Sequence, residues 1–481
     1  MTFNSLIFAA FLPIVFCLYW FVFARSLKWQ NLLVVAASYV FYGWWDWKFL
    51  ILIAITSFCS WWSGLLIHRF REERRKAWWI SAANIILNLG ILGLFKYYDF
   101  FARSFADLFL GGKADGILLH LILPVGISFF TFQALSYSID VYRGRVEPVR
   151  DVVQFFAYVS FFPQLVAGPI ERATSLLPQF GRERVFGYSQ AVDGLRQMLW
   201  GYFKKIVIAD WCGVYVDKVF GDIPGQSGVQ LAAAAILFAF QIYGDFSGYS
   251  DIAIGVSKLF GINLTRNFAT PYFSRDIAEF WRRWHISLTT WFRDYLYIPM
   301  GGSQCPKPRV VLNTMVIFLV SGLWHGANWT FLVWGAFHAL LFMPLILSGK
   351  NRRYKGIVAE GRALPSFKEL GQILLTFALV TVGWVIFRAD NLSQAWAFFA
   401  GMLRWRSISD LYFFFDRAFL SRAVWIALML LVEWVDRGEE HGLSMAGVRH
   451  GTIRYAIYIA IILVTILYFD DGSPKFIYFQ F

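Results

Sequence analysis

Long apolar runs, separated by short polar or basic loops, fill this chain from one end to the other. A membrane-spanning helix needs about 20 mostly apolar residues, and shorter runs can serve as half-helices that are buried in protein. The pattern therefore predicts an all-α polytopic membrane protein, with about 11–13 membrane-embedded helices or half-helices in a single domain, residues 1–481. The runs lie near residues 5–24, 31–43, 48–67, 77–95, 117–139, 152–168, 192–220, 229–260, 310–323, 329–347, 370–387, 418–435 and 452–469.

The composition excludes a soluble globular domain. Hydrophobic residues make up 58% of the chain and charged residues 16%, and the mean hydropathy is +0.53, whereas soluble domains carry about 25% charged residues. The net charge of +13 does not indicate nucleic acid, because the Lys and Arg residues gather in the short loops between apolar runs. We therefore expect membrane lipids to surround the protein and no nucleic acid to bind it.

The basic residues also predict the orientation, because cytoplasmic loops carry an excess of Lys and Arg. The cluster at 68–76 is the strongest cytoplasmic marker, and the loop 221–228, which contains no Lys or Arg, is predicted to be external. Counting spans from the cluster places Met1 and the tail 471–481 outside the cytoplasm. Met1–Phe23 has no basic start and no small-residue cleavage site, so we interpret it as a retained first membrane helix.

Local motifs narrow the possible chemistry. The four cysteines, Cys17, Cys59, Cys212 and Cys305, are scattered without paired spacing, so we expect neither a disulfide framework nor a metal site. The chain contains no Gly-rich phosphate loop and no Gly-x-Ser-x-Gly elbow of the kinds that mark nucleotide binding or a serine nucleophile. Any chemistry is therefore expected from a histidine that acts as general base on a hydroxyl supplied by another molecule.

The first candidate residue is His325, in the middle of the apolar region 310–347. Gly322 and Gly326 flank it and interrupt the helix, so we predict a broken helical pair that enters the membrane and returns. An ionisable group at this depth is costly and indicates function. The alternatives are a buried histidine that is bonded to a backbone carbonyl, or a gating or proton-relay residue of a transporter.

The segment 276–298 is predicted to form an amphipathic helix at the cytoplasmic interface, because it is too charged to span the membrane. His285 falls on its apolar, aromatic face, whereas Arg282 and Arg283 fall on its polar face. His285 is the second candidate residue. The alternative is that His285 only packs and that the arginines anchor the helix to lipid headgroups.

Further polar residues interrupt other apolar runs and are candidates for orienting groups or for the wall of a tunnel. Asp245 and Asp251 lie in the run 229–260, where a carboxylate needs a partner or a wet cavity. Asp245 either orients a catalytic group or pairs with an arginine that only holds the bundle together. The remaining candidates of this kind are Gln133, Trp324 and Asn328.

Three motifs together resemble the membrane-bound O-acyltransferase family, in its bacterial alginate O-acetyltransferase branch. Residues 275–287 read RDIAEFWRRWHIS, and 40 positions after His285 stands the histidine of the sequence GLWHG, residues 322–326. Residues 244–251 read GDFSGYSD. The combination is specific, and the resemblance extends over nearly the whole chain.

The resemblance implies a ring of tilted helices around a thinned centre, with a transmembrane tunnel, in a multi-pass protein of the bacterial inner membrane. It implies that acetyl-CoA is the donor substrate on the cytoplasmic side, without a bound cofactor, and that an exported polysaccharide such as alginate is acetylated. His325 takes the position of the catalytic histidine, and His285 that of the second polar residue. Arg282 and Arg283 are the candidates for binding the donor phosphates.

The last six residues, 476–481, resemble a terminal motif of the same branch, which implies an acyl relay. The Tyr478 hydroxyl would accept the acyl group and pass it to an extracytoplasmic acetyltransferase partner that works with the polysaccharide-export machinery. The alternative is an aromatic anchor at the membrane surface. Two other functions stay open, namely a transporter or flippase, and an O-acyltransferase for lipids or proteins.

Overall fold

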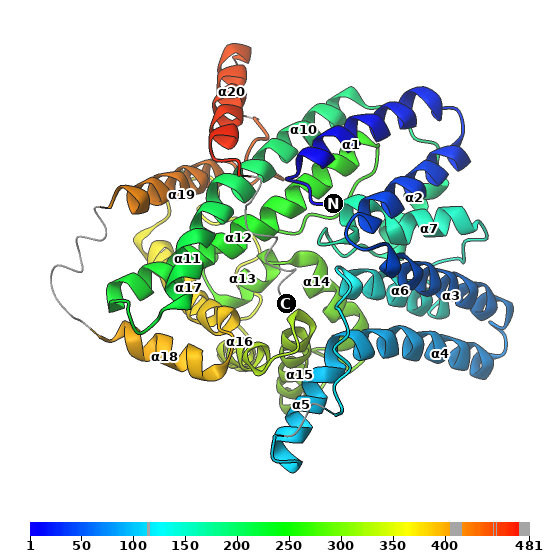
Figure 1. Cartoon of the computed structure of the whole chain (residues 1–481), viewed down its shortest axis with the longest axis horizontal. Helices are drawn as coiled ribbons and strands as arrows, with labels where there is room; N and C mark the ends of the chain where they lie inside the picture. Colours follow the sequence, from blue (N-terminus) through cyan, green and yellow to red (C-terminus); the bar gives the residue numbers. More distant parts are fainter. Residues whose placement is uncertain (113–115, 405–415, 446, 449, 471–481) are drawn as a thin grey trace. The chain divides into compact units, whose positions relative to one another are not determined.

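The computed structural model describes residues 1–112, 116–404, 416–445, 447–448 and 450–470. All regular elements in these ranges are helices (Figure 1). Among the described residues, six helical stretches are long and apolar enough to cross a bilayer, which confirms the prediction of an all-α polytopic membrane protein. They are Trp47–Arg69, Arg74–Phe109, Gly228–Leu259, Lys307–His325, Trp329–Leu347 and Phe367–Arg388.

The chain forms two compact units. Unit 1 comprises Met1–Leu195 and Ala253–Thr265, and unit 2 comprises Arg196–Ile252 and Arg266–Phe481. The helices of unit 1 are α1 (Leu6–Cys17), η1 (Leu18–Val22), α2 (Leu27–Gly43), η2 (Trp47–Phe49), α3 (Leu50–Arg69), α4 (Arg74–Leu92), η3 (Gly93–Tyr97), α5 (Tyr98–Phe109), α6 (Ile127–Tyr142), α7 (Val152–Ser160), α8 (Phe162–Leu165), α9 (Ala173–Leu176), η4 (Leu177–Gly181) and the start of α10 (Tyr188–Tyr202).

Small and polar side chains hold the centre of unit 1 together. Helix α6 is buried along nearly its whole length and packs on α3 and α4. The Ser60 hydroxyl donates to Asn84 at 3.3 Å, and the Asn88 amide donates to Ser60 at 3.4 Å. Gly64 on α3 leaves room for the Tyr137 ring on α6, because a Cβ at position 64 would overlap that ring. Small residues and side-chain hydrogen bonds of this kind are typical of helix packing inside a membrane.

The apolar run that was predicted to be helical at 117–139 is irregular over its first part. Helix α6 begins only at Ile127, directly after Gly126, whose φ of 75° lies in the left-handed region. A Cβ at position 126 would also press on the carbonyl of Leu165, at 2.7 Å. Glycine therefore fits both the backbone turn and the close approach of the chain at this point.

Unit 2 contains the elements that carry both candidate histidines. Its helices are η5 (Phe203–Asp210), α11 (Trp211–Gly221), most of α12 (Gly228–Leu259), η6 (Pro271–Phe273), α13 (Ile277–Arg283), α14 (Ile286–Phe292), η7 (Arg293–Tyr297), α15 (Lys307–His325), α16 (Trp329–Leu347), α17 (Phe367–Arg388), α18 (Leu392–Met402), α19 (Arg417–Val435) and α20 (Gly451–Leu467).

The amphipathic segment that was predicted as one helix over 276–298 is divided in the structure. Helix α13 ends at Arg283 and α14 begins at Ile286, and the π-helical turn η7 follows. Between the two α-helices, Trp284 is extended and His285 is left-handed, with φ 44° and ψ 55°. The amphipathic pattern does not reveal this break, because neither residue is a helix breaker by composition.

Helices α15 and α16 form a closely packed pair (Figure 1). A Cβ at Gly322 would overlap the backbone of Phe331, and a Cβ at Gly335 would overlap the backbone of Phe318. Glycines at such positions allow two backbones to approach more closely than other residues permit. Because α15 ends at His325, this packing holds the imidazole against the neighbouring helix.

Candidate active site

The backbone at His285 turns sharply and directs this side chain into the protein. The residue has left-handed dihedral angles and caps the start of α14. Histidine is among the few residue types other than glycine that adopt this conformation with some frequency. Only 1% of His285 is exposed, so the turn delivers a titratable ring to the interior instead of leaving it on the helix surface.

A network around Asn267 determines which nitrogen of His285 carries the proton. Asn267 Oδ1 accepts from the backbone N–H of Ser287 at 3.3 Å and from its hydroxyl at 2.9 Å. Since this oxygen can only accept, His285 Nδ1, at 3.0 Å from it, must donate. The other nitrogen, Nε2, is then an unprotonated acceptor, and it has no hydrogen-bond partner within the described ranges.

His325 lies at the end of α15 within a group of aromatic rings. Its ring centroid is 5.0 Å from that of Trp324, 5.1 Å from that of Trp334 and 5.3 Å from that of Phe387. It is 4% exposed. The next residue, Gly326, has no room for a side chain, because a Cβ there would overlap the Phe331 ring.

Trp324 brings the two histidines into one cluster. Its ring lies 5.8 Å from the His285 ring and 5.0 Å from the His325 ring. The two residues are 40 positions apart in the sequence, yet they contact the same indole. This arrangement places two imidazoles in a buried aromatic region of unit 2, where hydrogen bonds are stronger than in water.

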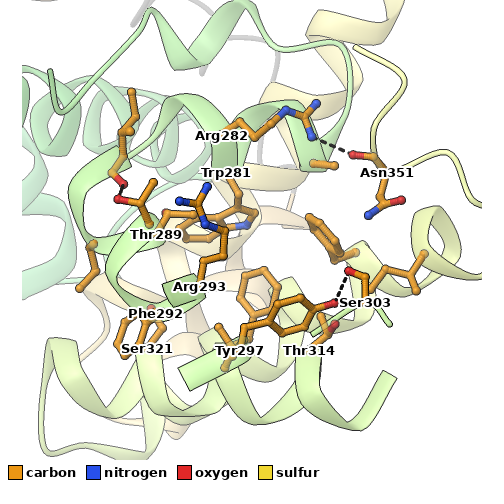
Figure 2. Close-up of a pocket in the computed structure, with 18 of the residues that line it drawn as sticks. Trp281, Arg282, Thr289, Phe292, Arg293, Tyr297, Ser303, Thr314, Ser321 and Asn351 are labelled. Carbon is orange, nitrogen blue, oxygen red and sulfur yellow. Dashed lines mark hydrogen bonds between the residues drawn. The ribbon is translucent and has the colours of Figure 1, made fainter. Parts of the chain in front are cut away.

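Unit 2 contains a pocket of about 560 Å³ (Figure 2), and neither the two histidines nor Trp324 are among its described lining residues. Arg282, Arg293 and Arg352 line it, and none of the described lining residues is an Asp or a Glu. Arg293 itself pairs with the neighbouring Asp294. Ser321 also lines the pocket and stands four residues before His325 on α15, so the two side chains lie on the same face of the helix, one turn apart.

The remaining lining of the pocket is mostly apolar. Trp281 of α13, Phe318 of α15 and Phe342 of α16 supply large side chains to it. A pocket lined by both arginines and large apolar side chains suits a ligand that carries an anionic group and an uncharged chain.

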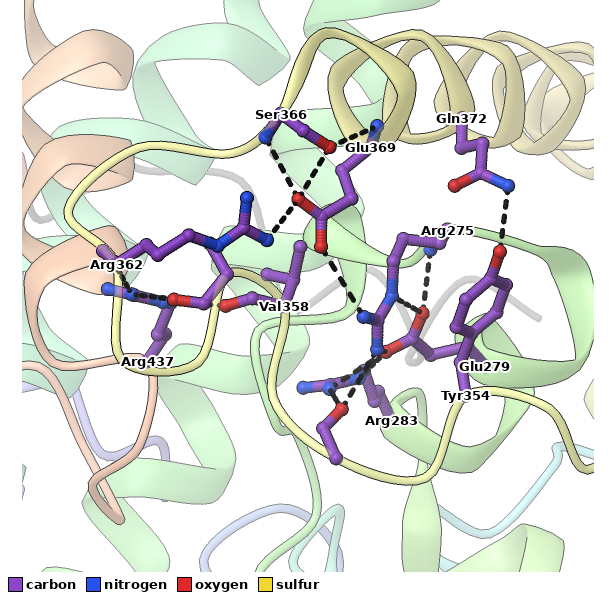
Figure 3. A network of polar contacts seen from close by, with 12 residues as sticks. Arg275, Glu279, Arg283, Tyr354, Val358, Arg362, Ser366, Glu369, Gln372 and Arg437 are labelled. Atoms are coloured by element: carbon purple, nitrogen blue, oxygen red, sulfur yellow. Dashed lines mark hydrogen bonds and ion pairs between the residues drawn. The ribbon is translucent and has the colours of Figure 1, made fainter.

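The adjacent arginines Arg282 and Arg283 have different surroundings. Arg282 lines the pocket and donates to the carbonyls of Asn351, at 2.8 Å, and Tyr354, at 2.6 Å. Arg283 does not line it and donates to the buried Glu279 carboxylate at 2.9 Å (Figure 3). Both arginines therefore bind the segment that follows α16, Arg283 through the Gly356 carbonyl at 3.0 Å, and of the two only Arg282 lines the pocket.

Glu279 is the centre of that network. Arg275 binds it with two bonds, at 2.9 and 3.0 Å, and Arg283 binds the same carboxylate from the next turn (Figure 3). Arg275 also lies 3.8 Å from Glu369, at the start of α17. Since Glu279 is only 1% exposed, these paired charges anchor α13, the helix that carries Trp281 and Arg282, to its surroundings.

The two aspartates of α12 have partners that the sequence did not indicate. Asp245 pairs with Lys205 at 2.7 Å, a lysine instead of the arginine that was considered. Asp251 pairs with Lys204 at 2.6 Å and accepts from Gln197 at 2.9 Å. Both lysines belong to the π-helical segment η5, an irregularity that often occurs at functional positions.

The other candidates lie in different settings. Asn328 caps α16, accepting from the Thr330 N–H at 3.1 Å, and donates to the Asp390 carbonyl at 2.7 Å. Gln133 is buried in α6 and belongs to unit 1. Tyr478 lies outside the described residues. Among the positions that the structure does describe, no three His, Cys, Asp or Glu side chains form a group that could hold a metal ion.

Sequence reasoning missed Trp281, Trp334 and His338. His338 is fully buried and lies 5.0 Å from each of the two indoles, centroid to centroid. The signal was present, because a histidine inside the apolar run 329–347 is an ionisable group within a membrane helix. The two tryptophans had no signal of their own in a chain with 22 tryptophans.

Acidification should destabilise the protein through His285. Burial lowers the pKa of His285 to about 3, so between about pH 6.5 and that value the unfolded chain binds a proton that the folded chain does not bind. The contribution of His285 is complete above about pH 6.5 and falls by up to about 1.4 kcal/mol for each pH unit below it. We expect the thermal unfolding midpoint in detergent to drop less between about pH 7 and about pH 5 in His285→Asn than in the wild type.

Asparagine suits this substitution because it tolerates left-handed dihedral angles. The matched control is His450→Asn, at an exposed histidine, which should keep the pH dependence of the wild type. Equal drops in the wild type and in His285→Asn would contradict the assignment of a neutral, buried imidazole.

Comparison with known proteins identifies the family. Residues 148–368, which include both histidine motifs, match the model of MBOAT, the membrane-bound O-acyltransferase family. The chain is 40% identical to the probable alginate O-acetylase AlgI of Pseudomonas aeruginosa, over 84% of this chain and 75% of that protein. It is 35% identical to the peptidoglycan O-acetyltransferase of Helicobacter pylori, over 85% and 80%. It is 26% identical to the teichoic acid D-alanyltransferase of Bacillus subtilis, over 68% and 82%. The chain belongs to the membrane-bound O-acyltransferase family.

Proposed function

We propose that this membrane-bound O-acyltransferase takes acetyl groups from acetyl-CoA on the cytoplasmic side and supplies them for O-acetylation of an exported polysaccharide such as alginate. The observation that carries the proposal is the meeting of His285 and His325 at Trp324, one helical turn from an arginine-lined pocket. The relatives support the choice of acyl group and acceptor, since two of those named above are, by name, a probable alginate O-acetylase and a peptidoglycan O-acetyltransferase.

In the proposed reaction His325 acts as general base. Its imidazole accepts the proton of the acceptor hydroxyl while the hydroxyl oxygen attacks the thioester carbon. The C–O bond forms, the C–S bond breaks, and the departing thiolate takes the proton from the imidazolium. A well-placed general base contributes about 10²–10⁴-fold to the rate, and the fixed approach of thioester and hydroxyl supplies much of the remainder.

His285 has an orienting role in this proposal. Its Nδ1–H is committed to Asn267, which leaves Nε2 as an acceptor that can receive a hydrogen bond from a reacting hydroxyl. The tautomer is fixed by the amide network, so the ring does not need to rearrange when the acceptor arrives. In this mechanism His325 moves the proton, and His285 holds the hydroxyl group in place.

The pocket is the proposed donor site. Phosphate groups of CoA suit Arg282, Arg293 and Arg352, because guanidinium groups bind phosphate oxygens with two parallel hydrogen bonds. The uncharged acyl arm would extend along the apolar side chains towards Ser321. CoA is too large and too charged to cross the bilayer, so a tunnel that passes only the acetyl group would keep the nucleotide inside.

The basic loops also support an orientation of the protein in the membrane. With the basic loops in the cytoplasm, the protein lies in the bacterial inner membrane with Met1 and the tail 471–481 outside. Tyr478 in that tail would carry the acetyl group to an extracytoplasmic acetyltransferase that acts with the polysaccharide-export machinery.

Removing the proposed base should abolish turnover. We expect purified wild-type protein, supplied with acetyl-CoA and an acceptor, to release free CoA. His325→Ala should release it at a rate that is lower by about 10²-fold or more. His450→Ala, at an exposed histidine, should keep wild-type turnover. A wild type that releases no CoA would contradict the assignment as an enzyme and favour a transporter, and a fully active His325→Ala would remove His325 from the mechanism.

The pocket arginines should distinguish acetyl-CoA from a truncated donor. We expect Arg282→Gln and Arg352→Gln to raise the KM for acetyl-CoA about tenfold or more, because each loses a charge-assisted bond to phosphate. The KM for acetyl-pantetheine, which has no phosphate, should stay near the wild-type value. Arg353→Gln, an exposed neighbour outside the pocket, is the matched control. Equal increases for both donors would point to damaged packing and contradict a phosphate site.

The relay requires the Tyr478 hydroxyl itself. Tyr478→Phe keeps an aromatic anchor but removes the oxygen that would form the ester, so we expect polysaccharide acetylation in cells to stop while the protein still inserts into the membrane. Tyr455→Phe, on an exposed tyrosine of α20, should acetylate normally. Normal acetylation by Tyr478→Phe would leave the tail as an anchor only.

A further inference from the structure

Two tryptophans stand between the donor pocket and His325. Trp281 lines the pocket (Figure 2), and its ring lies 5.6 Å from that of Trp334. Trp334 in turn lies 5.1 Å from His325. Trp281 is 8% exposed and Trp334 is completely buried. The two indoles thus connect the pocket to the proposed general base through ring contacts.

Both indoles have an unused hydrogen-bond donor. The Nε1 atoms of Trp281 and Trp334 are buried, and neither has a partner among the residues that the structure describes. Buried indole N–H groups usually find an acceptor. Elsewhere in the described part of the chain Trp20, Trp61 and Trp434 donate to backbone carbonyls at 2.8–2.9 Å, so an acceptor is available to other indoles of this protein.

His338 adds to the same deficit. It lies 5.0 Å from both rings, nearly perpendicular to Trp281, with an interplanar angle of 88°. Within the described part of the chain its two ring nitrogens also have no partner. A neutral imidazole carries one N–H donor and one acceptor nitrogen, so His338 adds one donor to those of the two indoles, which have no acceptor among the described residues. An oxygen atom that accepts two hydrogen bonds would complete the two indoles.

We propose that the indole N–H groups of Trp281 and Trp334 bind the acyl oxygen of the thioester, and that His338 is a positioning residue that holds the two rings. The inference rests on the proposed function and assigns the oxygen site of that reaction. When the acceptor hydroxyl adds to the carbonyl carbon, the C=O electron pair moves to the oxygen. The indoles stabilise this oxyanion until the C–S bond breaks, the C=O bond is restored and the thiolate leaves.

Preorganised donors of this kind act on the charge that develops in the transition state, so their loss lowers kcat more than it raises KM. The two donors come from different elements, α13 and α16, which the aromatic packing around His338 keeps in place. Helix α16 is the same helix that packs on α15. Trp334 of the proposed oxygen site and the general base His325 therefore lie on two helices, α16 and α15, that pack directly on each other.

The test replaces the acyl oxygen by sulfur. CoA release is measured with acetyl-CoA and with the dithioacetyl analogue, whose C=S sulfur is a weak hydrogen-bond acceptor. We expect wild-type protein to favour the oxygen donor strongly in kcat. Trp281→Phe and Trp334→Phe should each lose about 10²-fold in kcat with acetyl-CoA and much of the preference for oxygen. Trp200→Phe, at a buried tryptophan that stacks on Phe203, should keep the preference.

His338 is tested by restoring its ring. His338→Ala should lower the preference for oxygen as the tryptophan variants do, and His338→Phe, which returns a ring to the site, should recover it. A merely structural role would change the yield or stability of these variants without moving the ratio between the two donors.

The results separate a failure of the oxygen site from a failure of the proposed function. A wild type that turns over both donors without preferring oxygen overturns the inference, whether or not the variants fold. The inference is equally overturned if Trp281→Phe and Trp334→Phe keep the wild-type ratio, which would assign the unused donors to buried water. A wild type that releases no CoA from acetyl-CoA overturns the proposed function instead.

Discussion

The close packing of α15 on α16 is the interaction on which the rest of the site depends. Gly322 and Gly335 remove the side chains that would keep the two backbones apart, and the pair ends where His325 meets Trp334. A β-carbon at either glycine would have to push the helices apart, which in a tightly packed interior costs on the order of 1–3 kcal/mol. It would also separate the imidazole from its aromatic neighbours. The close packing of α15 on α16 therefore also fixes the position of the His325 ring, the proposed general base.

In unit 2 the lysines of η5 are paired with carboxylates, whereas several neutral polar groups have no hydrogen-bond partner among the described residues. The lysines of η5 have carboxylate partners, as in the 2.6 Å pair of Lys204 with Asp251, because an unpaired charge in such surroundings is prohibitively costly. The groups whose hydrogen-bonding capacity is unused within the described ranges include His285 Nε2 and the indole nitrogens of Trp281 and Trp334, all uncharged donors or acceptors. Leaving these unused costs less than leaving a charge unpaired. The proposed mechanism therefore uses neutral groups, whereas the ion pairs of Glu279 hold α13, the helix that carries Trp281.

The sequence predicted the helical class and most of the apolar runs, because these follow from hydropathy. Short motifs singled out the two histidines, which the structure brings to the same indole. The sequence did not predict the break at Trp284 and His285, since left-handed dihedral angles at a histidine arise from tertiary contacts such as the Asn267 network. It also could not identify Lys205 as the partner of Asp245, because the pairing joins a π-helical segment to a different helix. Trp281 and Trp334 were hidden among many tryptophans; only their positions in space, and the absence of acceptors among the described residues around them, separate them from packing residues.

The proposed site differs in charge between its two regions, as the two parts of the proposed thioester donor do. Arginines occur in the pocket, whereas the groups around His325 that have been identified are aromatic rings. A donor with an anionic handle and a small uncharged acyl group has one orientation that satisfies both regions. The reverse orientation would bury phosphate charge among aromatic side chains, which is strongly unfavourable. Because the oxyanion forms only in the transition state, indole donors that are unused beforehand stabilise that state more than the ground state, which is the condition for lowering the barrier.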